Sequence, residues 1–235
     1  MPEIRVACLD MAGTTVADDG SVMAAFAAAA AEFGLVPGAP GYDNAIAFVQ
    51  DTMGQSKIEV FRQLLGRAGY TGEDQAQRAN RIFEQSYAES VRNGLVTPLP
   101  GAIETITALR AAGIKVCLAT GFAPVTRDAL LDALGWRPLI DLALSPADAG
   151  RGRPWPDMPL TALLRLGGGA VSELAVVGDT ASDVESGLRA GAGLVAAVTT
   201  GAGTRESLAA AGAPHILDSI GGLLPLVGVG SAVPH

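Results

Sequence analysis

The chain has 235 residues, of which 49% are hydrophobic, so it can form one large domain or a core with a smaller insert. Its formal net charge of −8 at pH 7 argues against binding to nucleic acid or to an anionic membrane surface. The two cysteines, Cys8 and Cys117, lie in apolar runs that are typical of buried strands. We therefore expect reduced thiols and a cytoplasmic protein.

The first predicted element is a buried strand in the apolar run 4–9, directly before Asp10. The pattern then predicts helices alone, at about 21–33, 45–51, from 53–57 to 68, and 73–92. After a proline-rich turn at 98–101, strands are expected at 114–119, 139–144, 174–178, 193–198 and near 215, with helices between them. This alternation predicts an α/β core with a parallel sheet from residues 1–16 and 98–235, and an inserted all-helical domain from residues 17–97.

Polar residues lie at or after the ends of several predicted strands. Asp10, Thr120, Arg153 and Asp179 follow four of them, and Asp183 comes one helical turn later. Taken singly, each has an ordinary structural explanation, such as a loop or helix cap for the aspartates and a surface charge for the arginine. Ligands of open α/β sheets bind outside the carboxyl ends of the strands. The shared placement therefore predicts one site.

The residue types at this predicted site fit phosphoryl transfer. Asp10 would attack phosphorus and, with Asp179, would hold Mg²⁺, a hard cation that prefers oxygen ligands. Arg153 would neutralise the phosphoryl oxygens, and Thr120 would donate a hydrogen bond to them. The glycine-containing loop 12–15 would turn its N–H groups towards the bound anion.

Four motifs occur in order with suitable spacing, namely Asp-x-Ala-Gly-Thr-Thr from Asp10, Thr-Gly at 120–121, Gly-Arg-Pro-x-Pro from 152, and Val-Gly-Asp-x-x-Ser-Asp ending at Asp183. Over nearly its whole length the chain resembles the haloacid dehalogenase (HAD) superfamily. The resemblance implies a Rossmann-like core with a helical cap domain. It also implies that Asp10 is the nucleophile, that the Ala12 carbonyl and Asp179 help bind Mg²⁺, and that Asp183 lies just behind them.

Ala12 departs from most phosphatases of the superfamily, which carry a second aspartate there as acid and base. Losing a general acid costs an ester phosphatase roughly 10²–10⁴-fold in rate. The phosphonoacetaldehyde hydrolases, or phosphonatases, also have alanine there, and form an imine on a cap lysine in a Met-Gly-x-x-Lys motif, which matches Met53 to Lys57. The resemblance thus implies catalytic roles for Asp10, Ala12, Lys57, Thr120 and Arg153, and substrate contacts from Thr14, Met53, Gly54, Gly121 and Phe122.

The residues around Lys57 agree with an unusual lysine. Phe61 and Leu64 follow it at helical spacing, so it lies near the apolar face of its helix. It is also in the first helical turn, where the dipole disfavours a cation and lowers the pKa of the amine. A lowered pKa favours imine formation. The alternative is a lysine that extends along apolar surface and orients or gates the substrate.

Two positions differ from the phosphonatase pattern, because Val60 and Phe122 stand where a histidine and a tyrosine are expected. The imine route is therefore short of acid–base groups. We expect a Mg²⁺-dependent hydrolase that cleaves a small phosphonate aldehyde or ketone. The alternatives are a phosphate-monoester phosphatase in which Lys57 binds substrate without forming an imine, and a non-catalytic phospho-ligand binder. The resemblance also implies a homodimer through the cap helices.

Overall fold

The computed structural model describes residues 3–17 and 19–230. Its centre is a parallel six-stranded sheet with the order β5-β4-β1-β6-β7-β8. The strands are β1 (Val6–Asp10), β4 (Lys115–Ala119), β5 (Leu142–Leu144), β6 (Leu174–Gly178), β7 (Leu194–Val198) and β8 (His215–Leu217). The sheet confirms the predicted α/β class. Strand β1 pairs with β4 on one side and β6 on the other, so Asp10, Thr120 and Asp179 reach the same edge.

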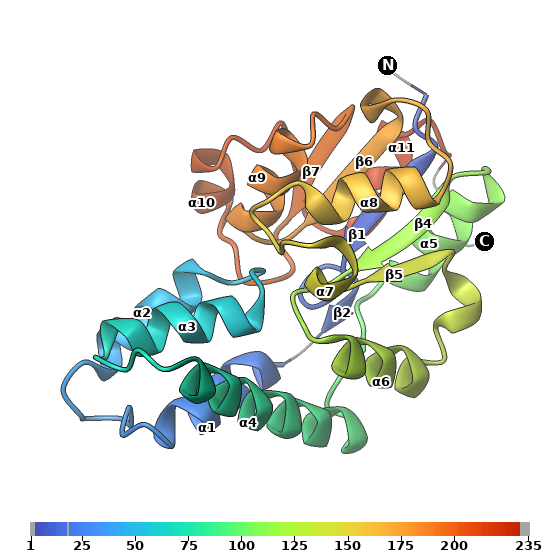
Figure 1. Cartoon of the computed structure of the whole chain (residues 1–235). Helices are drawn as coiled ribbons and strands as arrows, with labels where there is room; N and C mark the ends of the chain where they lie inside the picture. Colours follow the sequence, from blue (N-terminus) through green and yellow to red (C-terminus); the bar gives the residue numbers. More distant parts are fainter. Residues whose placement is uncertain (1–2, 18, 231–235) are drawn as a thin grey trace.

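Alternation along β1 sends its side chains to two different layers. Ala7 and Leu9 pack in the largest hydrophobic cluster, which also holds residues of α5 (Ala102–Ala111) and α11 (Leu223–Leu226). Val6 and Cys8 pack in a second cluster with α8 (Asp157–Arg165). Figure 1 shows α8 and α9 (Ala181–Arg189) in front of the sheet and α5 behind it. Because both faces are covered, β1 is apolar along its whole length until Asp10.

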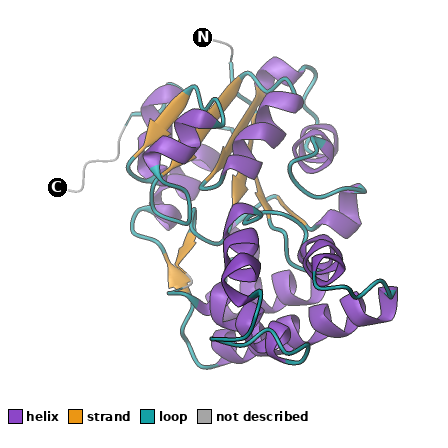
Figure 2. Cartoon of the chain, turned by 90° about the vertical axis from the view of Figure 1, so that its left-hand side faces the viewer, coloured by secondary structure: helices purple, strands orange, loops and turns teal. Residues whose placement is uncertain are grey.

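The four helices that follow the first short strand after β1 form a separate group beyond the carboxyl ends of the sheet strands (Figures 1 and 2). We call this group the helical insert; it consists of α1 (Ser21–Ala31), α2 (Tyr42–Asp51), α3 (Lys57–Arg67) and α4 (Glu73–Arg92). The expectation of helix alone over 17–97 was wrong at both ends. There β2 (Val16–Ala17) and β3 (Thr97–Pro98) pair as a short antiparallel ribbon. Two-residue strands are too short to give a periodic pattern.

Some further elements differ from the predicted ones. Helix α2 begins at Tyr42, three residues before the expected start. The helices α7 (Pro146–Ala149) and α10 (Arg205–Ala210) were not predicted, because each is too short for an amphipathic pattern. Helix α6 (Pro124–Leu134) has the expected bounds. No helix of the described residues is long and apolar enough to cross a membrane.

An aromatic cluster fills the centre of the helical insert. Phe83 on α4 packs against Phe26 on α1, with 4.7 Å between the ring centroids, and also contacts Phe61 on α3. Phe122, in the loop after β4, extends from the sheet side into this cluster and lies 4.5 Å from the ring of Tyr87. The insert and the sheet domain are therefore joined by a shared apolar core as well as by the ribbon.

Phe83→Ala tests how far this cluster stabilises the fold. The side chain is fully buried, so we expect the free energy of unfolding to fall by about 3–5 kcal/mol, from lost burial and the remaining cavity. Urea denaturation measures the change. Leu164→Ala is the control, because Leu164 is 75% exposed and its loss should change stability by less than about 0.5 kcal/mol. Equal effects of the two substitutions would contradict this account.

Candidate active site

Arg153 connects four parts of the chain at the end of β1. Its Nη2 lies 2.8 Å from Oδ1 of Asp10, and its Nε lies 2.6 Å from Oδ1 of Asp183. It also donates to the carbonyl oxygens of Ala119, at the end of β4, and of Gly54, in the helical insert. The side chain is 5% exposed, so the expected alternative of a surface charge does not hold. A guanidinium this deep needs several acceptors, and the four contacts supply them.

Asp179 lies at the end of β6, beside the loop that follows Asp10. Its Oδ1 accepts a hydrogen bond from the Thr14 hydroxyl, and its Oδ2 accepts one from the Ala202 N–H at 2.7 Å. Gly13 and Gly201 allow this close approach, since a Cβ at either position would lie within 2.4 Å of the Asp179 carboxylate. The glycines therefore bring two loops against one acidic side chain.

Asp183 has a structural role as well as a charge role. It is the third residue of α9, and Thr180 is the N-cap of that helix, so the two side chains form a capping box. The backbone N–H of Thr180 donates to Oδ2 of Asp183, which leaves Oδ1 to pair with Arg153. The capping box thus fixes the carboxylate that holds the arginine in place.

The carboxylates at this strand edge are crowded and dry. Burial raises the pKa of Asp10 well above its usual value, and the nearby charges of Asp183 and Asp179 add to the rise, whereas Arg153 opposes it. Burial and the Asp183 charge raise the pKa of Asp179 to about 7. Asp10 and Asp183 are thus paired with Arg153 while Asp179 is not, and the edge favours added positive charge.

Lys57 is the first residue of α3 and is buried among aromatic side chains. Its Nζ lies 5.5 Å from the ring centroids of both Phe26 and Phe122. Burial lowers the pKa of the amine from 10.5 to about 8, although the charge of Asp10 opposes this shift. The buried position agrees with the apolar face predicted for Lys57, and the neutral amine becomes accessible near neutral pH.

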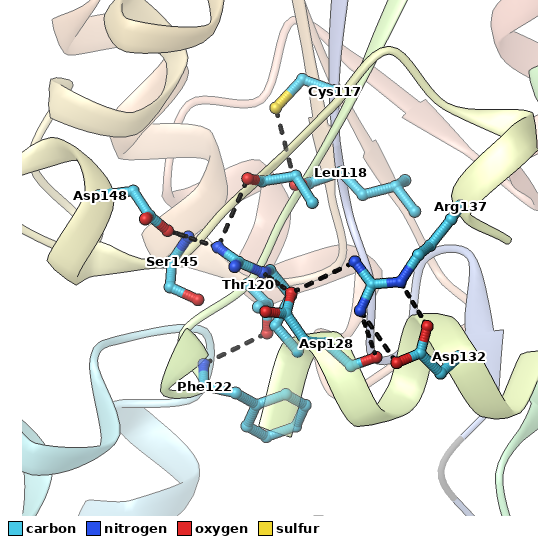
Figure 3. A network of polar contacts seen from close by, with 11 residues as sticks. Cys117, Leu118, Thr120, Phe122, Asp128, Asp132, Arg137, Ser145 and Asp148 are labelled. Carbon is cyan, nitrogen blue, oxygen red and sulfur yellow. Dashed lines mark hydrogen bonds and ion pairs between the residues drawn. The ribbon is translucent and has the colours of Figure 1, made fainter. Parts of the chain in front are cut away.

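The loop after β4 places Thr120, Gly121 and Phe122 between the sheet and the helical insert. The Phe122 N–H donates to the Thr120 hydroxyl oxygen, and the Gly121 carbonyl accepts from the Lys57 N–H at 3.2 Å. Figure 3 shows Thr120 and Phe122 beside the polar network that joins α6 to Asp148 of α7. In that network the Arg127 guanidinium of α6 forms an ion pair with the Asp148 carboxylate. The Thr120 N–H also donates to the Leu144 carbonyl of β5, so the loop is bonded both to the sheet and to the start of α3.

A cavity of about 400 Å³ lies between the helical insert and the sheet edge. The predicted site residues that line it are Asp10, Ala12, Met53, Gly54, Lys57, Thr120, Gly121, Phe122 and Asp179. Side chains that the sequence reading did not assign also line it, including Val22 and Met23 of α1 and Thr200 of the loop after β7. The structure thus brings the lysine of the insert and the aspartates of the sheet to one chamber.

Some predicted contacts take another form in the structure. The N–H groups of Gly13, Thr14 and Thr15 bond to carbonyls within their own loop, at Val16 and Met11, so they do not face an anion. The Thr14 side chain is fully buried and bonds Asp179, which assigns it to orienting that carboxylate.

One acidic residue near the cavity was not predicted from the sequence to belong to the site. Glu84 on α4 is buried. Its carboxylate is satisfied there by hydrogen bonds from the Ala123 N–H and the Thr126 hydroxyl at the start of α6. Its position three residues before Tyr87, on the apolar face of the helix, was the available signal.

The family model for haloacid dehalogenase-like hydrolases matches residues 4–191. The chain belongs to this family. It is 31% identical over 207 residues to a phosphonoacetaldehyde hydrolase of Bacteroides fragilis, covering 81% of this chain and 74% of that protein. It is 29% identical to the probable phosphatase IndB of Dickeya dadantii, covering 89% of this chain and 87% of the relative.

Another relative is longer. A phosphonoacetaldehyde hydrolase of Hahella chejuensis is 33% identical over 61% of this chain, and the match spans 48% of that protein, about half its length. Among solved structures, a phosphonoacetaldehyde hydrolase like protein from Oleispira antarctica superposes with a TM-score of 0.80, at 26% identity, over 96% of this chain and 92% of the other. The sheet with an inserted helical group is thus the fold of HAD hydrolases.

Gly121→Ala tests the close approach of the two halves of the site. A Cβ at Gly121 would lie 2.3 Å from the Gln55 carbonyl oxygen of the insert, so the insert must move away. We expect Lys57 to be modified several-fold faster by a small amine-reactive reagent, measured by mass spectrometry of the peptide that contains it. Gly169→Ala is the control, since its nearest neighbour would be the Glu173 carboxylate at 3.8 Å. Unchanged Lys57 labelling in a folded Gly121→Ala protein would contradict this interface.

Proposed function

We propose that this hydrolase cleaves the carbon–phosphorus bond of a small phosphonate aldehyde or ketone similar to phosphonoacetaldehyde, with Mg²⁺ as cofactor. The observation that carries the proposal is the position of Lys57, whose buried amine lines the same cavity as Asp10. A lysine with a lowered pKa is the group that forms an imine with a carbonyl substrate. The names of the relatives from Bacteroides fragilis and Hahella chejuensis support the same chemistry.

In the proposed reaction Lys57 first condenses with the substrate carbonyl, releasing water and forming an imine. The Asp10 carboxylate then attacks phosphorus, and the carbon–phosphorus bond breaks with its electron pair moving into the protonated imine to give an enamine. Water hydrolyses the aspartyl-phosphate to phosphate, and hydrolysis of the enamine releases the aldehyde. The sum is substrate plus one water giving aldehyde plus phosphate. No general acid is needed at Ala12, because carbon leaves as an enamine.

The remaining site residues would bind and orient the phosphonyl group. Arg153 favours the ionised form of Asp10, because their ion pair opposes the rise in pKa that burial causes. Arg153 is not among the residues that line the cavity, so its positive charge would act on the phosphonyl group through Asp10 rather than by direct contact. Thr120 lines the cavity and would donate its hydroxyl to the same group.

The donor set at the sheet edge fits Mg²⁺. Asp10 and Asp179 offer carboxylate oxygens, and Ala12, which lines the same cavity, would add its backbone carbonyl. No cluster of three or more His, Cys, Asp and Glu side chains within 3–17 and 19–230 forms a metal cage, so waters and substrate would complete the shell, as is usual for this ion. When bound, Mg²⁺ would offset the repulsion between the carboxylates and the phosphonyl group.

A second function is favoured by one observation. Val60 is buried, and Phe122 is packed in the aromatic cluster. Neither side chain can transfer a proton, although these are the positions at which the phosphonatase pattern has acid–base groups. In the alternative, the protein hydrolyses a phosphate monoester of a small metabolite, and the Lys57 amine binds the substrate without forming a covalent bond. The relative named as a probable phosphatase supports this reading.

Lys57→Arg separates the two functions. Arginine keeps the positive charge but does not form an imine, so we expect phosphate release from phosphonoacetaldehyde to fall to the background rate. Lys115→Arg is the matched control, because Lys115 is exposed and pairs with Asp141 far from the cavity, and it should keep full activity. The assay is phosphate release with Mg²⁺, from phosphonoacetaldehyde and from a set of phosphate monoesters. Hydrolysis of esters that survives in Lys57→Arg would favour the phosphatase.

A further inference from the structure

Glu84 is a buried carboxylate that the proposed reaction does not use. It belongs to α4 of the helical insert, yet its hydrogen-bond donors come from the sheet domain. Its Oε1 accepts from the Ala123 N–H at 3.2 Å, and its Oε2 accepts from the Thr126 hydroxyl. A carboxylate has about four acceptor positions, so these bonds leave Glu84 with capacity for further donors.

A second cavity of about 120 Å³ lies between Glu84 and Lys57. Both side chains line it, and Lys57, Gly121 and Phe122 line the larger active-site cavity as well. Asn80, one turn before Glu84 on α4, also lines the second cavity, and its buried Oδ1 has no hydrogen-bond partner among the described residues. At roughly 30 Å³ per water molecule, this space holds about four waters, and the polar groups give them partners.

The charges around Lys57 come from two directions. Asp10, Asp179 and Arg153 face it from the sheet edge, and Glu84 faces it from α4 of the insert. The Asp10 charge is already paired with Arg153. Glu84 and Lys57 influence each other, because the carboxylate favours the protonated amine and the amine favours the ionised carboxylate. Burial raises the pKa of Glu84 in spite of its hydrogen bonds, which moves this carboxyl towards the range of a proton acceptor.

We propose that Glu84 is the positioning residue for Lys57 and exchanges protons with its amine through water held in the second cavity beside Asn80. This inference rests on the proposed imine function. It supplies the acid–base group that Val60 and Phe122 do not provide. The proton path would run through the second cavity, which Asp10 does not line, so it is separate from the attack on phosphorus.

The proton transfers balance over imine formation. The Glu84 carboxylate takes one proton from the Lys57 ammonium through water, and the neutral amine adds to the substrate carbonyl carbon. After the proton on nitrogen has moved to oxygen, the neutral carbinolamine loses its hydroxyl group. Protonated Glu84 returns its proton through the same water, and the hydroxyl leaves as water. The products are a protonated imine, water and the original carboxylate, so no outside acid or base is consumed.

The first test is the pKa of Lys57, measured by NMR in the metal-free protein labelled with ¹³C-lysine. The chain has two lysines, so the spectrum holds two ε-CH₂ signals, and Lys57→Arg assigns them. We expect the Lys57 signal to titrate near pH 8. In Glu84→Gln, loss of one negative charge should lower that midpoint by roughly half a unit to one unit. If Glu84 only held the insert in place, the substitution would loosen the insert and let water reach the Lys57 amine. The midpoint would then rise, because burial is what lowers this pKa. An unchanged or raised midpoint would overturn the proposal.

The second test is the rate at which borohydride traps the imine of phosphonoacetaldehyde. Glu84→Gln leaves more neutral amine at pH 7.5, so a charge effect alone would speed trapping. The proposed proton exchange predicts instead that trapping slows by roughly 100-fold or more, as expected for a lost acid–base group. Glu84→Asp keeps a carboxylate and should recover part of the rate. Trapping in Glu84→Gln at or above the wild-type rate would overturn the proposal.

A control variant separates proton exchange from the structural bond that Glu84 makes. Thr126→Val removes the hydroxyl donor at the start of α6 and leaves the carboxylate in place. It should trap at close to the wild-type rate, and slowing equal to that of Glu84→Gln would assign the effect to structure and overturn the proposal. If the wild-type protein forms no imine with the aldehyde, the proposed function fails, whereas the NMR titration still decides whether Glu84 acts on Lys57.

Discussion

The site depends on the burial of one guanidinium. Arg153 is almost completely removed from water, and a charge in that position is tolerated only when it is fully paired and hydrogen-bonded. Its partners are the Asp10 and Asp183 carboxylates and the carbonyls of Ala119 and Gly54. Because they come from β1, α9, β4 and the helical insert, satisfying this charge brings the separate parts of the site together. Removing any partner would leave part of the buried guanidinium without a hydrogen-bond acceptor.

The helical insert adds a second constraint, which concerns Lys57. The aromatic cluster around Phe26 and Phe122 removes the amine from water and lowers its pKa, while the sheet edge gathers carboxylates whose pKa is raised. The lowered pKa of Lys57 favours its neutral amine, and the raised pKa of Asp10 favours its protonated carboxyl, in the same cavity. In the proposed function, a carbonyl phosphonate would present its carbonyl carbon to the amine and its phosphonyl group to the sheet edge, so both halves of the site would be needed.

Much of this arrangement follows from the sequence, and the exceptions have physical reasons. Apolar runs that end at Asp10 and Asp179 predict parallel strands, and the topology of such sheets then places both aspartates on one edge. The burial of Arg153 was not predictable, because a charged residue between glycine and proline resembles a surface loop. Glu84 was missed because one acidic residue on a long polar helix looks solvated, and its partners are 39 and 42 residues away.

The most direct measurement is peptide mapping of Asp10→Asn after incubation with phosphonoacetaldehyde and borohydride. Asparagine keeps the shape of the site but removes the attacking carboxylate, so imine formation is separated from cleavage of the carbon–phosphorus bond. We expect a reduced adduct that retains the phosphonate, on the peptide containing Lys57, with no phosphate released. Absence of an adduct on Lys57, in a protein whose wild-type form releases phosphate from this substrate, would contradict the account.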